Sequence, residues 1–180
     1  SSDLFVTRKI TRAVARIVLG LQDKFYLGNL SSKRDWGHAK DYVKAMHLIL
    51  QQDKPEDFVI ATGITTVIRD FVKMAFNEAG VELEFKGQGV DEKAFVKKCN
   101  NPEYQLPIGK EVLSVDPRYF RPTEVDLLIG DPSKAKTKLG WEPEYDLAGL
   151  VKDMVSSDIQ LMKKEQFLMN GGYKPKNYFE

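Results

Sequence analysis

The sequence predicts an α/β fold, because segments with the apolar spacing of helices alternate with short apolar runs that end at turn residues. The clearest run is FVIA at 58–61, which lies between a polar turn and Thr62-Gly63. An unbroken apolar run of this length is typical of a strand covered on both faces, as in a parallel sheet. The 180 residues are 42% hydrophobic and 29% charged, so we expect a globular unit with a core of its own.

The first half of the chain is expected to contain three helices with one apolar face each, at about 4–21, 38–52 and 67–79. In the second of these, Ala39, Val43, Met46 and Leu50 share that face. Gly80 supplies the glycine that commonly follows a helix. Short strands are expected at 24–29, 58–61 and 83–85.

A basic stripe runs along the first predicted helix, where Arg8, Arg12 and Arg16 stand four residues apart. Residues at this spacing lie on one face of a helix. We expect this face to be solvated, or to point toward a part of the protein that the chain does not contain.

The second half is expected to begin with an irregular loop at 87–110, followed by a strand at 112–115 and a structured loop at 116–126. Asp131-Pro132 has the pattern of an N-cap followed by proline in the first helical position, and Gly140 ends that short helix. Asp146 is expected to cap a last helix that extends to about residue 168.

Composition excludes several classes of function. The chain has 27 basic and 26 acidic residues, a net charge of +1, which does not support nucleic-acid binding through bulk charge. One cysteine and two histidines make a disulfide or a cysteine- or histidine-rich metal site unexpected. We find neither a signal-peptide pattern nor an apolar run of about 20 residues, and we therefore expect a cytoplasmic protein without a membrane span.

Two motifs of nicotinamide-dependent enzymes are absent from the sequence. The nearest approach to G-x-G-x-x-G is Gly87-Gln88-Gly89, but Glu92 stands where the third glycine is needed. None of the seven tyrosines is followed four positions later by a lysine, so the Tyr-x-x-x-Lys pair of short-chain dehydrogenases is missing. We therefore assign no catalytic residue to this chain and leave the cofactor-binding residues unknown.

Four segments together resemble the second half of the GDP-mannose 4,6-dehydratases, which are extended short-chain dehydrogenases. The segments are FVTRKI at 5–10, RDWGHAKDYV at 34–43, FVIATG at 58–63 and YFRPTEV at 119–125. The stretch from Gly130-Asp131-Pro132 to Trp141 is shared more widely by extended members. The resemblance runs from about residue 5 to the end of the chain and omits the 87–110 loop.

The resemblance implies that the parent protein is an NADP-dependent lyase that converts GDP-mannose to GDP-4-keto-6-deoxymannose, toward GDP-fucose and related deoxysugars. The coenzyme motif and the catalytic residues of the family lie in its N-terminal half. It follows that this chain would be the substrate-binding portion, inactive alone, with about 38–63 adding a helix and a strand to the Rossmann sheet. The implied partners are GDP-mannose, that N-terminal half, and further copies of the parent in a dimer or tetramer.

Five residues carry over from the family as the ones that hold the GDP-sugar, namely Val6, Lys9, Arg34, Arg121 and Glu124. Arginine offers a planar fork of donors that matches phosphate oxygens. Lys9 could reach a phosphate or ribose oxygen, and Val6 would pack against the ligand. Glu124 could accept from the guanine N–H groups, but an ion pair with Arg121 is an equal alternative. Arg34, likewise, could pair with its neighbour Asp35 instead of a ligand.

Two other readings stay open at this point. The chain could derive from a nucleotide-sugar epimerase or a UDP-sugar dehydratase, or it could be a non-catalytic module that binds a GDP-sugar or docks with a separate coenzyme domain. We also expect the chain to self-associate, because a strand at 58–61 would lack its neighbours and leave an open edge.

Overall fold

A four-stranded mixed sheet forms the centre of the larger lobe in the computed structural model, which describes residues 5–121, 123, 125 and 127–173. Its strands are β1 (Phe25–Leu27), β6 (Glu111–Val115), β5 (Lys93–Cys99) and β4 (Val81–Lys86), in that spatial order. β1 pairs with β6 in parallel, whereas β6, β5 and β4 pair in antiparallel fashion. The parallel pair joins segments that are distant in the sequence.

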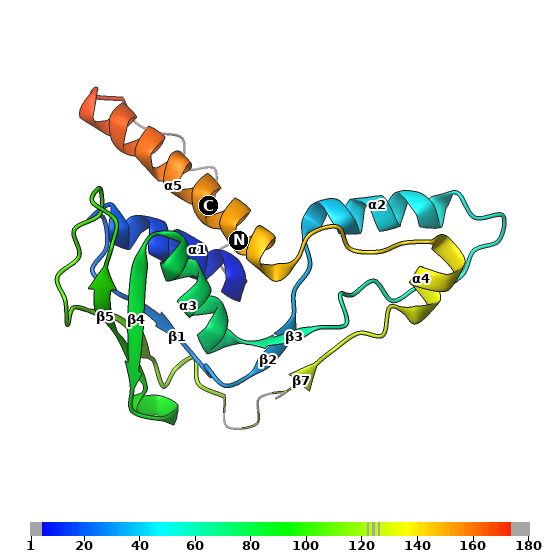
Figure 1. Cartoon of the computed structure of the whole chain (residues 1–180), viewed down its shortest axis with the longest axis horizontal. Coiled ribbons are helices and arrows are strands. Elements are labelled where there is room, and N and C mark those ends of the chain that lie inside the picture. Colours follow the sequence, from blue (N-terminus) through cyan, green and yellow to red (C-terminus); the bar gives the residue numbers. More distant parts are fainter. Residues whose placement is uncertain (1–4, 122, 124, 126, 174–180) are drawn as a thin grey trace.

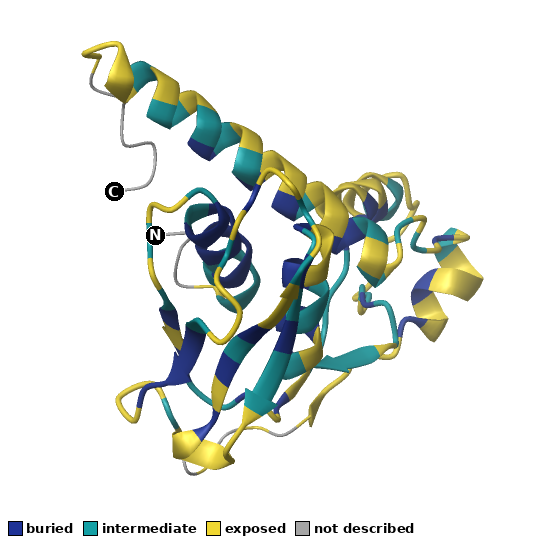
Figure 2. Cartoon of the chain, turned by 60° about the vertical axis from the view of Figure 1, so that its left-hand side comes forward, coloured by how far each residue is buried: buried dark blue, intermediate teal, exposed yellow. Residues whose placement is uncertain are grey.

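Three helices build the core of this lobe with the sheet (Figures 1 and 2). α1 (Val6–Val18) and α3 (Ile68–Glu78) bury one face each, and the 24-residue helix α5 (Leu147–Asn170) packs across both. The largest apolar side chains of the core are fully buried and come from both helices and strands: Ile10, Ile17, Phe71, Phe76, Leu113 and Val96. The C-terminal end of α5 extends beyond the lobe (Figure 2).

A small three-stranded sheet leads from this lobe to a second, smaller one (Figure 1). Its order is β3 (Thr65–Val67), β2 (Lys33–Asp35) and β7 (Leu127–Leu128). β2 is antiparallel to β3 and parallel to β7. Arg34 therefore lies on the central strand of this connection.

The smaller lobe contains α2 (Ala39–Leu50), α4 (Ser133–Leu139) and a short core around Trp141, which is fully buried. The indole N–H of Trp141 donates to the carbonyl of Asp41 at 2.9 Å. The Asp41 carboxylate in turn accepts from the backbone N–H groups of Glu144 and Tyr145. These bonds fix the segment after α4 against the start of α2.

Most predicted helix ends are confirmed. Asp146 caps α5 by accepting from the N–H of Gly149 at 2.7 Å. Gly140 ends α4 in the left-handed conformation, with φ of 63°. The start of α4 differs from the prediction, because Pro132 is the capping position and the helix begins at Ser133, whose N–H is accepted by the Asp131 carboxylate.

The prediction of a strand at 58–61 is wrong for this structure, in which residues 55–62 adopt no regular secondary structure. Phe58 and Ile60 pack against the small core, whereas Val59 is half exposed. A strand needs a neighbouring strand to pair its backbone hydrogen-bonding groups. In the described part of the chain, the core formed with α2 and α4 lies beside this segment instead. The segment instead runs beside Gly130, where an added Cβ would lie 2.4 Å from that of Ala61.

The prediction of a loop at 87–110 is also wrong in part, because it contains the seven-residue strand β5. Ala94 and Val96 are fully buried and alternate with more exposed neighbours, as in a strand with one covered face. Phe95 between them is apolar as well, and the flanking lysines are charged. The alternation of apolar and polar residues that is typical of a strand with one covered face is therefore not visible in the sequence.

The predicted exposure of two helix faces is wrong. Arg12 is 2% exposed, and Arg8 forms an ion pair with the buried Asp158 of α5, so the basic stripe is not a solvated face. On α2, the apolar residues Val43, Met46 and Leu50 are exposed instead of buried. The helix turns a different face, with Ala45, toward the small core.

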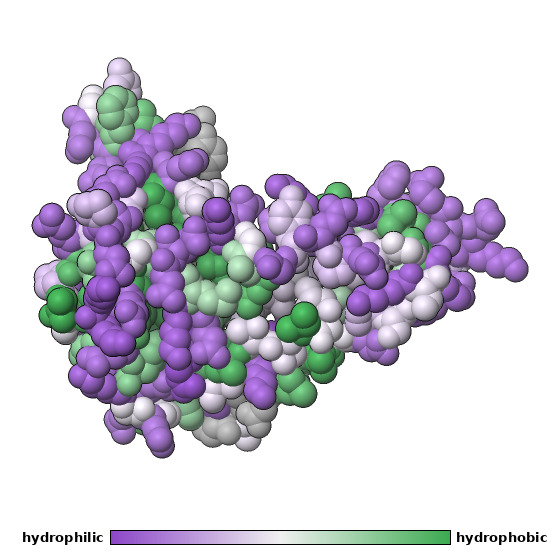
Figure 3. All heavy atoms as spheres, in the orientation of Figure 1, coloured by the Kyte–Doolittle hydropathy of each residue, from purple (hydrophilic) through white to green (hydrophobic). Residues whose placement is uncertain are grey.

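Hydrophobic side chains also gather on the surface between the two lobes, over the small sheet (Figure 3). Among the exposed apolar residues of this region are Ile64, Leu127, Leu128 and Ile129. Within the described ranges, no helix is both long and apolar enough to cross a membrane.

Candidate nucleotide-binding groove

The candidate site lies where the parallel strands β1 and β6 end. Gly28 and Asn29 follow β1, and the 116–121 loop follows β6. The carboxyl ends of parallel strands meet at one edge of a sheet, where ligands of α/β proteins commonly bind. The two loops are joined directly, since the N–H of Asp116 donates to the carbonyl of Leu27 at 2.9 Å.

Four of the five predicted site residues line one hollow at this edge. Val6 and Lys9 come from α1, Arg34 from β2 and Arg121 from the 116–121 loop. The hollow has a volume of about 320 Å³ and is completed by Leu27, Gly28, Asn29, Ile68, Arg118 and Tyr119. Glu124, the fifth residue, lies outside the described residues. The structure therefore brings together side chains that are more than a hundred positions apart in the sequence.

Arg34 is bonded to backbone carbonyls. Its Nη1 donates to the carbonyl of Val125 at 2.7 Å and to that of Lys33 at 2.8 Å. The neighbouring Asp35 is engaged elsewhere, where its carboxylate accepts from the N–H groups of Thr62 and Gly63. Arg34 thus links the small sheet to the segment after Arg121 at the wall of the hollow.

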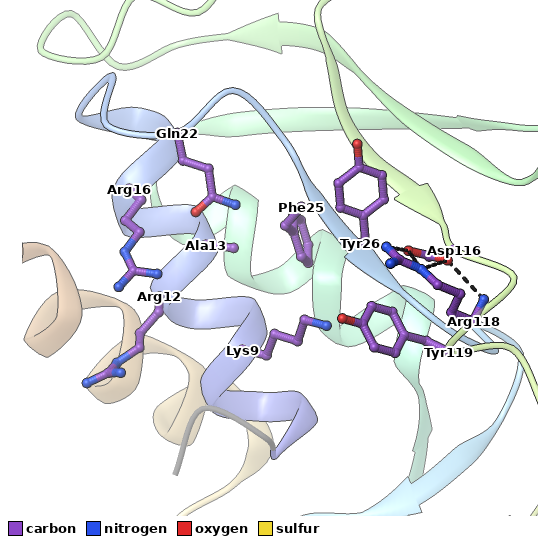
Figure 4. Close-up of a pocket in the computed structure, with 10 residues that line it drawn as sticks. All are labelled: Lys9, Arg12, Ala13, Arg16, Gln22, Phe25, Tyr26, Asp116, Arg118 and Tyr119. Atoms are coloured by element: carbon purple, nitrogen blue, oxygen red, sulfur yellow. Dashed lines mark hydrogen bonds and ion pairs between the residues drawn. The ribbon is translucent and has the colours of Figure 1, made fainter. Parts of the chain in front are cut away.

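A second hollow of about 280 Å³ adjoins the first, and both are lined by Lys9, Arg118 and Tyr119. In Figure 4, Lys9 extends from α1 toward Tyr119, whereas Arg12 and Arg16 extend from the same helix away from Asp116. Because the two hollows share these three lining residues, we treat them together and call them the cationic groove.

Charge in the cationic groove is mostly positive. Burial lowers the pKa of Lys9, although the nearby Asp116 carboxylate opposes this shift. The ammonium lies 4.1 Å from the centre of the Tyr119 ring, a cation–π contact. The pKa of Asp116 is lowered by its hydrogen bonds with Arg118, which holds that carboxylate at 2.8 Å. Among the described lining residues, one acid therefore faces several cations, an arrangement that suits an anionic ligand.

Arg118 and Tyr119 were not singled out as site residues from the sequence. Both stand within three positions of Arg121, in the loop that the resemblance already included. A signal was therefore present, namely a second arginine and an aromatic residue in the same proline-bounded loop.

The Gly87-Gln88-Gly89 turn does not have the geometry of a dinucleotide-binding glycine turn. Gly87 and Gly89 belong to the connection between the antiparallel strands β4 and β5, which continues as a single 3-10 turn (Gly89–Asp91). A pyrophosphate-binding glycine turn instead joins a strand to the N-terminus of a helix. The local backbone explains why residue 87 is a glycine. Its φ is 81°, and an added Cβ would lie 2.3 Å from the carbonyl oxygen of Asp91.

Solved structures of other proteins show which fold this chain has. The structure of RMD from Pseudomonas aeruginosa, complexed with NADPH, matches with a TM-score of 0.66 and 18% identity, over 88% of this chain and 44% of the other. UDP-glucose 4-epimerase from Bifidobacterium longum matches with a TM-score of 0.57 and 18% identity, over 86% and 40%. The fold is thus that of the extended short-chain dehydrogenases.

Sequence comparison then identifies the family. A family profile described as GDP-mannose 4,6 dehydratase matches residues 1–154, and the chain belongs to this family. The GDP-mannose 4,6-dehydratase of Yersinia enterocolitica is 53% identical over 95% of this chain and 46% of the relative. The human GDP-mannose 4,6 dehydratase is 50% identical over 88% and 40%. The chain therefore spans less than half the length of these relatives.

Proposed function

We propose that this chain is the C-terminal, substrate-binding portion of a GDP-mannose 4,6-dehydratase and that its cationic groove binds GDP-mannose. The observation that carries the proposal is the convergence of Val6, Lys9, Arg34 and Arg121 on one hollow. These residues come from a helix, a strand and a loop, yet they line a single space beside the ends of two parallel strands. Relatives that carry the name of this enzyme support the choice of ligand.

The chemistry of each residue assigns a part of the ligand to it. Arg34 and Arg121 would bind the pyrophosphate, whose closely spaced charges match two guanidinium groups. Lys9, partly buried on α1, would donate to a phosphate or ribose oxygen, and Val6 would pack against the ligand. Glu124 would accept from the adjacent N1 and N2 donors of guanine, a pairing that uracil, with its single N–H group, could not reproduce.

The whole enzyme would be an NADP-dependent lyase acting toward GDP-fucose, with its coenzyme motif and catalytic residues in an N-terminal portion. NADP would be held by that portion, because the nearest approach to a glycine-rich motif in this sequence, Gly87-Gln88-Gly89, lies in a turn between antiparallel strands. The segment 38–63 would complete the Rossmann sheet once that portion is present, and the parent would act as a cytoplasmic dimer or tetramer.

Calorimetric titration of this chain with GDP and with UDP tests the proposal. Arg34→Ala and Arg121→Ala should each weaken GDP binding by about 1.5–3 kcal/mol, as expected for the loss of charge-assisted hydrogen bonds. Lys97→Ala is the matched control, since it removes an exposed cation on β5 that pairs with Glu82. Equal affinity for UDP and GDP would favour an epimerase or UDP-sugar dehydratase, and undiminished GDP binding by both arginine variants would reject the site.

NADPH should not bind to this chain, and no 4-keto-6-deoxy sugar should form from GDP-mannose. The physical reason is the hairpin geometry at Gly87, which offers no helix N-terminus to a pyrophosphate. Fluorescence titration with NADPH and a product assay measure both. Saturable binding of NADPH or turnover above a blank would contradict this assignment.

A further inference from the structure

The side chain of Asn29 makes a two-point contact with the backbone of Arg121. Its Nδ2 donates to the Arg121 carbonyl at 3.0 Å, and its Oδ1 accepts from the Arg121 N–H at 2.8 Å. A side-chain amide carries a donor and an acceptor side by side, as a peptide group does. Asn29 therefore pairs with Arg121 as a neighbouring strand would, at a point where neither residue belongs to a sheet.

Gly28 allows the two segments to approach closely enough for this contact. A Cβ added at Gly28 would lie 2.2 Å from the carbonyl oxygen of Tyr119 and 2.8 Å from its carbonyl carbon. These are backbone atoms, so the clash could not be relieved by a change of rotamer. Glycine at 28 and asparagine at 29 thus act together to hold the 116–121 loop against the end of β1.

The contact fixes the backbone from which the Arg121 side chain enters the groove. Arg121 is itself exposed, and the described part of its loop is stabilised from within at Asp116, whose carbonyl accepts from Tyr119 and Phe120 and whose carboxylate accepts from Arg118. Without Asn29, the loop would keep those bonds but lose its connection to β1 at Arg121. The position of the Arg121 guanidinium would then be less restricted. Binding of an anion would have to order it, and this entropic cost would weaken the affinity.

We infer that Asn29 is a positioning residue for ligand binding, acting through Arg121, with Gly28 as its steric partner. The link to a ligand rests on the proposed function, because it takes Arg121 to bind the pyrophosphate. The structural half of the inference, that Asn29 orders Arg121, does not depend on it.

The chain contains a matched control for this arrangement. Asn101 also bridges two backbone groups, with its Nδ2 donating to Ala79 and its Oδ1 accepting from Glu103. It too faces a glycine, since a Cβ on Gly80 would lie 2.8 Å from that of Asn101. This second contact lies beside β4, at the edge of the sheet opposite β1. Asn101→Ala therefore removes the same chemistry away from the cationic groove.

Hydrogen exchange measured by NMR tests the structural half without any ligand. In Asn29→Ala, the amide of Arg121 should exchange about tenfold faster than in the unaltered chain, because it loses its acceptor. The amide of Val115, which donates to Glu92, should be unaffected. Asn101→Ala should instead accelerate exchange at Glu103 and leave Arg121 unchanged. Unchanged exchange at Arg121 in Asn29→Ala would overturn the inference.

Binding of inorganic pyrophosphate and of GDP tests the functional half. Asn29→Ala should weaken both by about fivefold to tenfold, an effect expected for two neutral hydrogen bonds, whereas Asn101→Ala should weaken neither. In the Arg121→Ala background, Asn29→Ala should have no further effect, because the residue it positions is gone. Additive losses would show that Asn29 acts in another way and would overturn the inference.

The two failures are distinguishable. If the unaltered chain binds neither pyrophosphate nor GDP, the proposed function fails and the role of Asn29 in ligand binding fails with it. If the unaltered chain binds both and Asn29→Ala binds equally well, the proposed function stands and only the inference about Asn29 is lost.

Discussion

Glu111 lies in an environment that is created by residues distant from it in the sequence. Three donors converge on its carboxylate at the start of β6: Lys24 at 2.6 Å, Ser114 at 2.7 Å and Lys93 at 3.0 Å. These bonds lower its pKa from the ordinary value of 4.5 to about 2, with the Lys24 bond as the largest cause. Because the charged form is favoured by folding, Glu111 stabilises the fold at neutral pH.

The stability that Glu111 contributes should disappear in acid. It is fully present above the unfolded pKa and is lost as the pH falls from about 4.5 to about 2. Glu111→Gln should therefore be less stable than the unaltered chain at pH 7, and the difference should vanish toward pH 2. Denaturant unfolding at several pH values measures this, and Ser114→Ala, which removes one donor, should give an intermediate profile. A Glu111 carboxyl that titrates near 4.5 in the folded chain would contradict the prediction.

For single residues, the sequence indicated which side chains line the site, but it did not indicate which residues they bond to. Val6, Lys9, Arg34 and Arg121 could be chosen because a family resemblance linked them, and the structure gathers them in one hollow. The partner of Asp35 could not be chosen in this way. The adjacent Arg34 was the expected partner. The Asp35 carboxylate instead accepts from Thr62 and Gly63, which lie near it only in the folded chain.

Among the elements, the pair α1 and α5 shows how a polar contact can lie inside an apolar interface. Asp158 on α5 is fully buried and accepts from the hydroxyl of Thr11 at 2.7 Å, while Arg8 pairs with it at 2.8 Å. A buried carboxylate is tolerated only with such partners. Arg8 of α1 is therefore turned toward a neighbouring helix.

Replacement of Asp158 by alanine should lower the free energy of unfolding by about 3 kcal/mol, because a buried ion pair and a buried hydrogen bond lose one partner. Denaturant unfolding monitored by circular dichroism measures the loss. Glu103→Gln is the control, since Glu103 pairs with Lys163 on the surface and should contribute little. A loss no larger than that of the control would show that α5 does not depend on this contact.

Helices were predicted more reliably than strands. A helix such as α3 carries its pattern within its own residues, with apolar positions on one face and Gly80 after its end. A strand depends on its neighbours. β5 was missed because Phe95 interrupts its alternation, and 58–61 was predicted as a strand that the described chain gives no partner.

At the level of the whole molecule, exposed apolar side chains lie on α2 and between the two lobes. Val43, Met46 and Leu50 lie on one face of α2 and are 63%, 60% and 81% exposed. Ile64 and the 127–129 segment add exposed apolar side chains between the lobes. Surfaces of this kind commonly mark contacts with another part of a protein or another copy.

The isolated chain should therefore self-associate. Sedimentation at two concentrations should show species heavier than the 20.5 kDa monomer, increasing with concentration. Met46→Lys combined with Leu50→Lys should reduce association, because charge on this face opposes apolar contact. Val90→Lys, which alters an exposed apolar residue in the turn after β4, should not. A sharp monomer at both concentrations would show that this face needs no partner.

The pairing of Asn29 with Arg121 joins positions 92 residues apart, and this separation has a consequence for how the protein is made. Closing so long a loop has an entropic cost that local contacts do not offset, so such pairings form late in folding. During synthesis, the β1 segment leaves the ribosome long before the strand that it must pair with exists. The groove cannot be occupied in that interval. A nucleotide that binds there would recognise only chains in which β1 and β6 have already met, and it would stabilise those chains against unfolding by mass action.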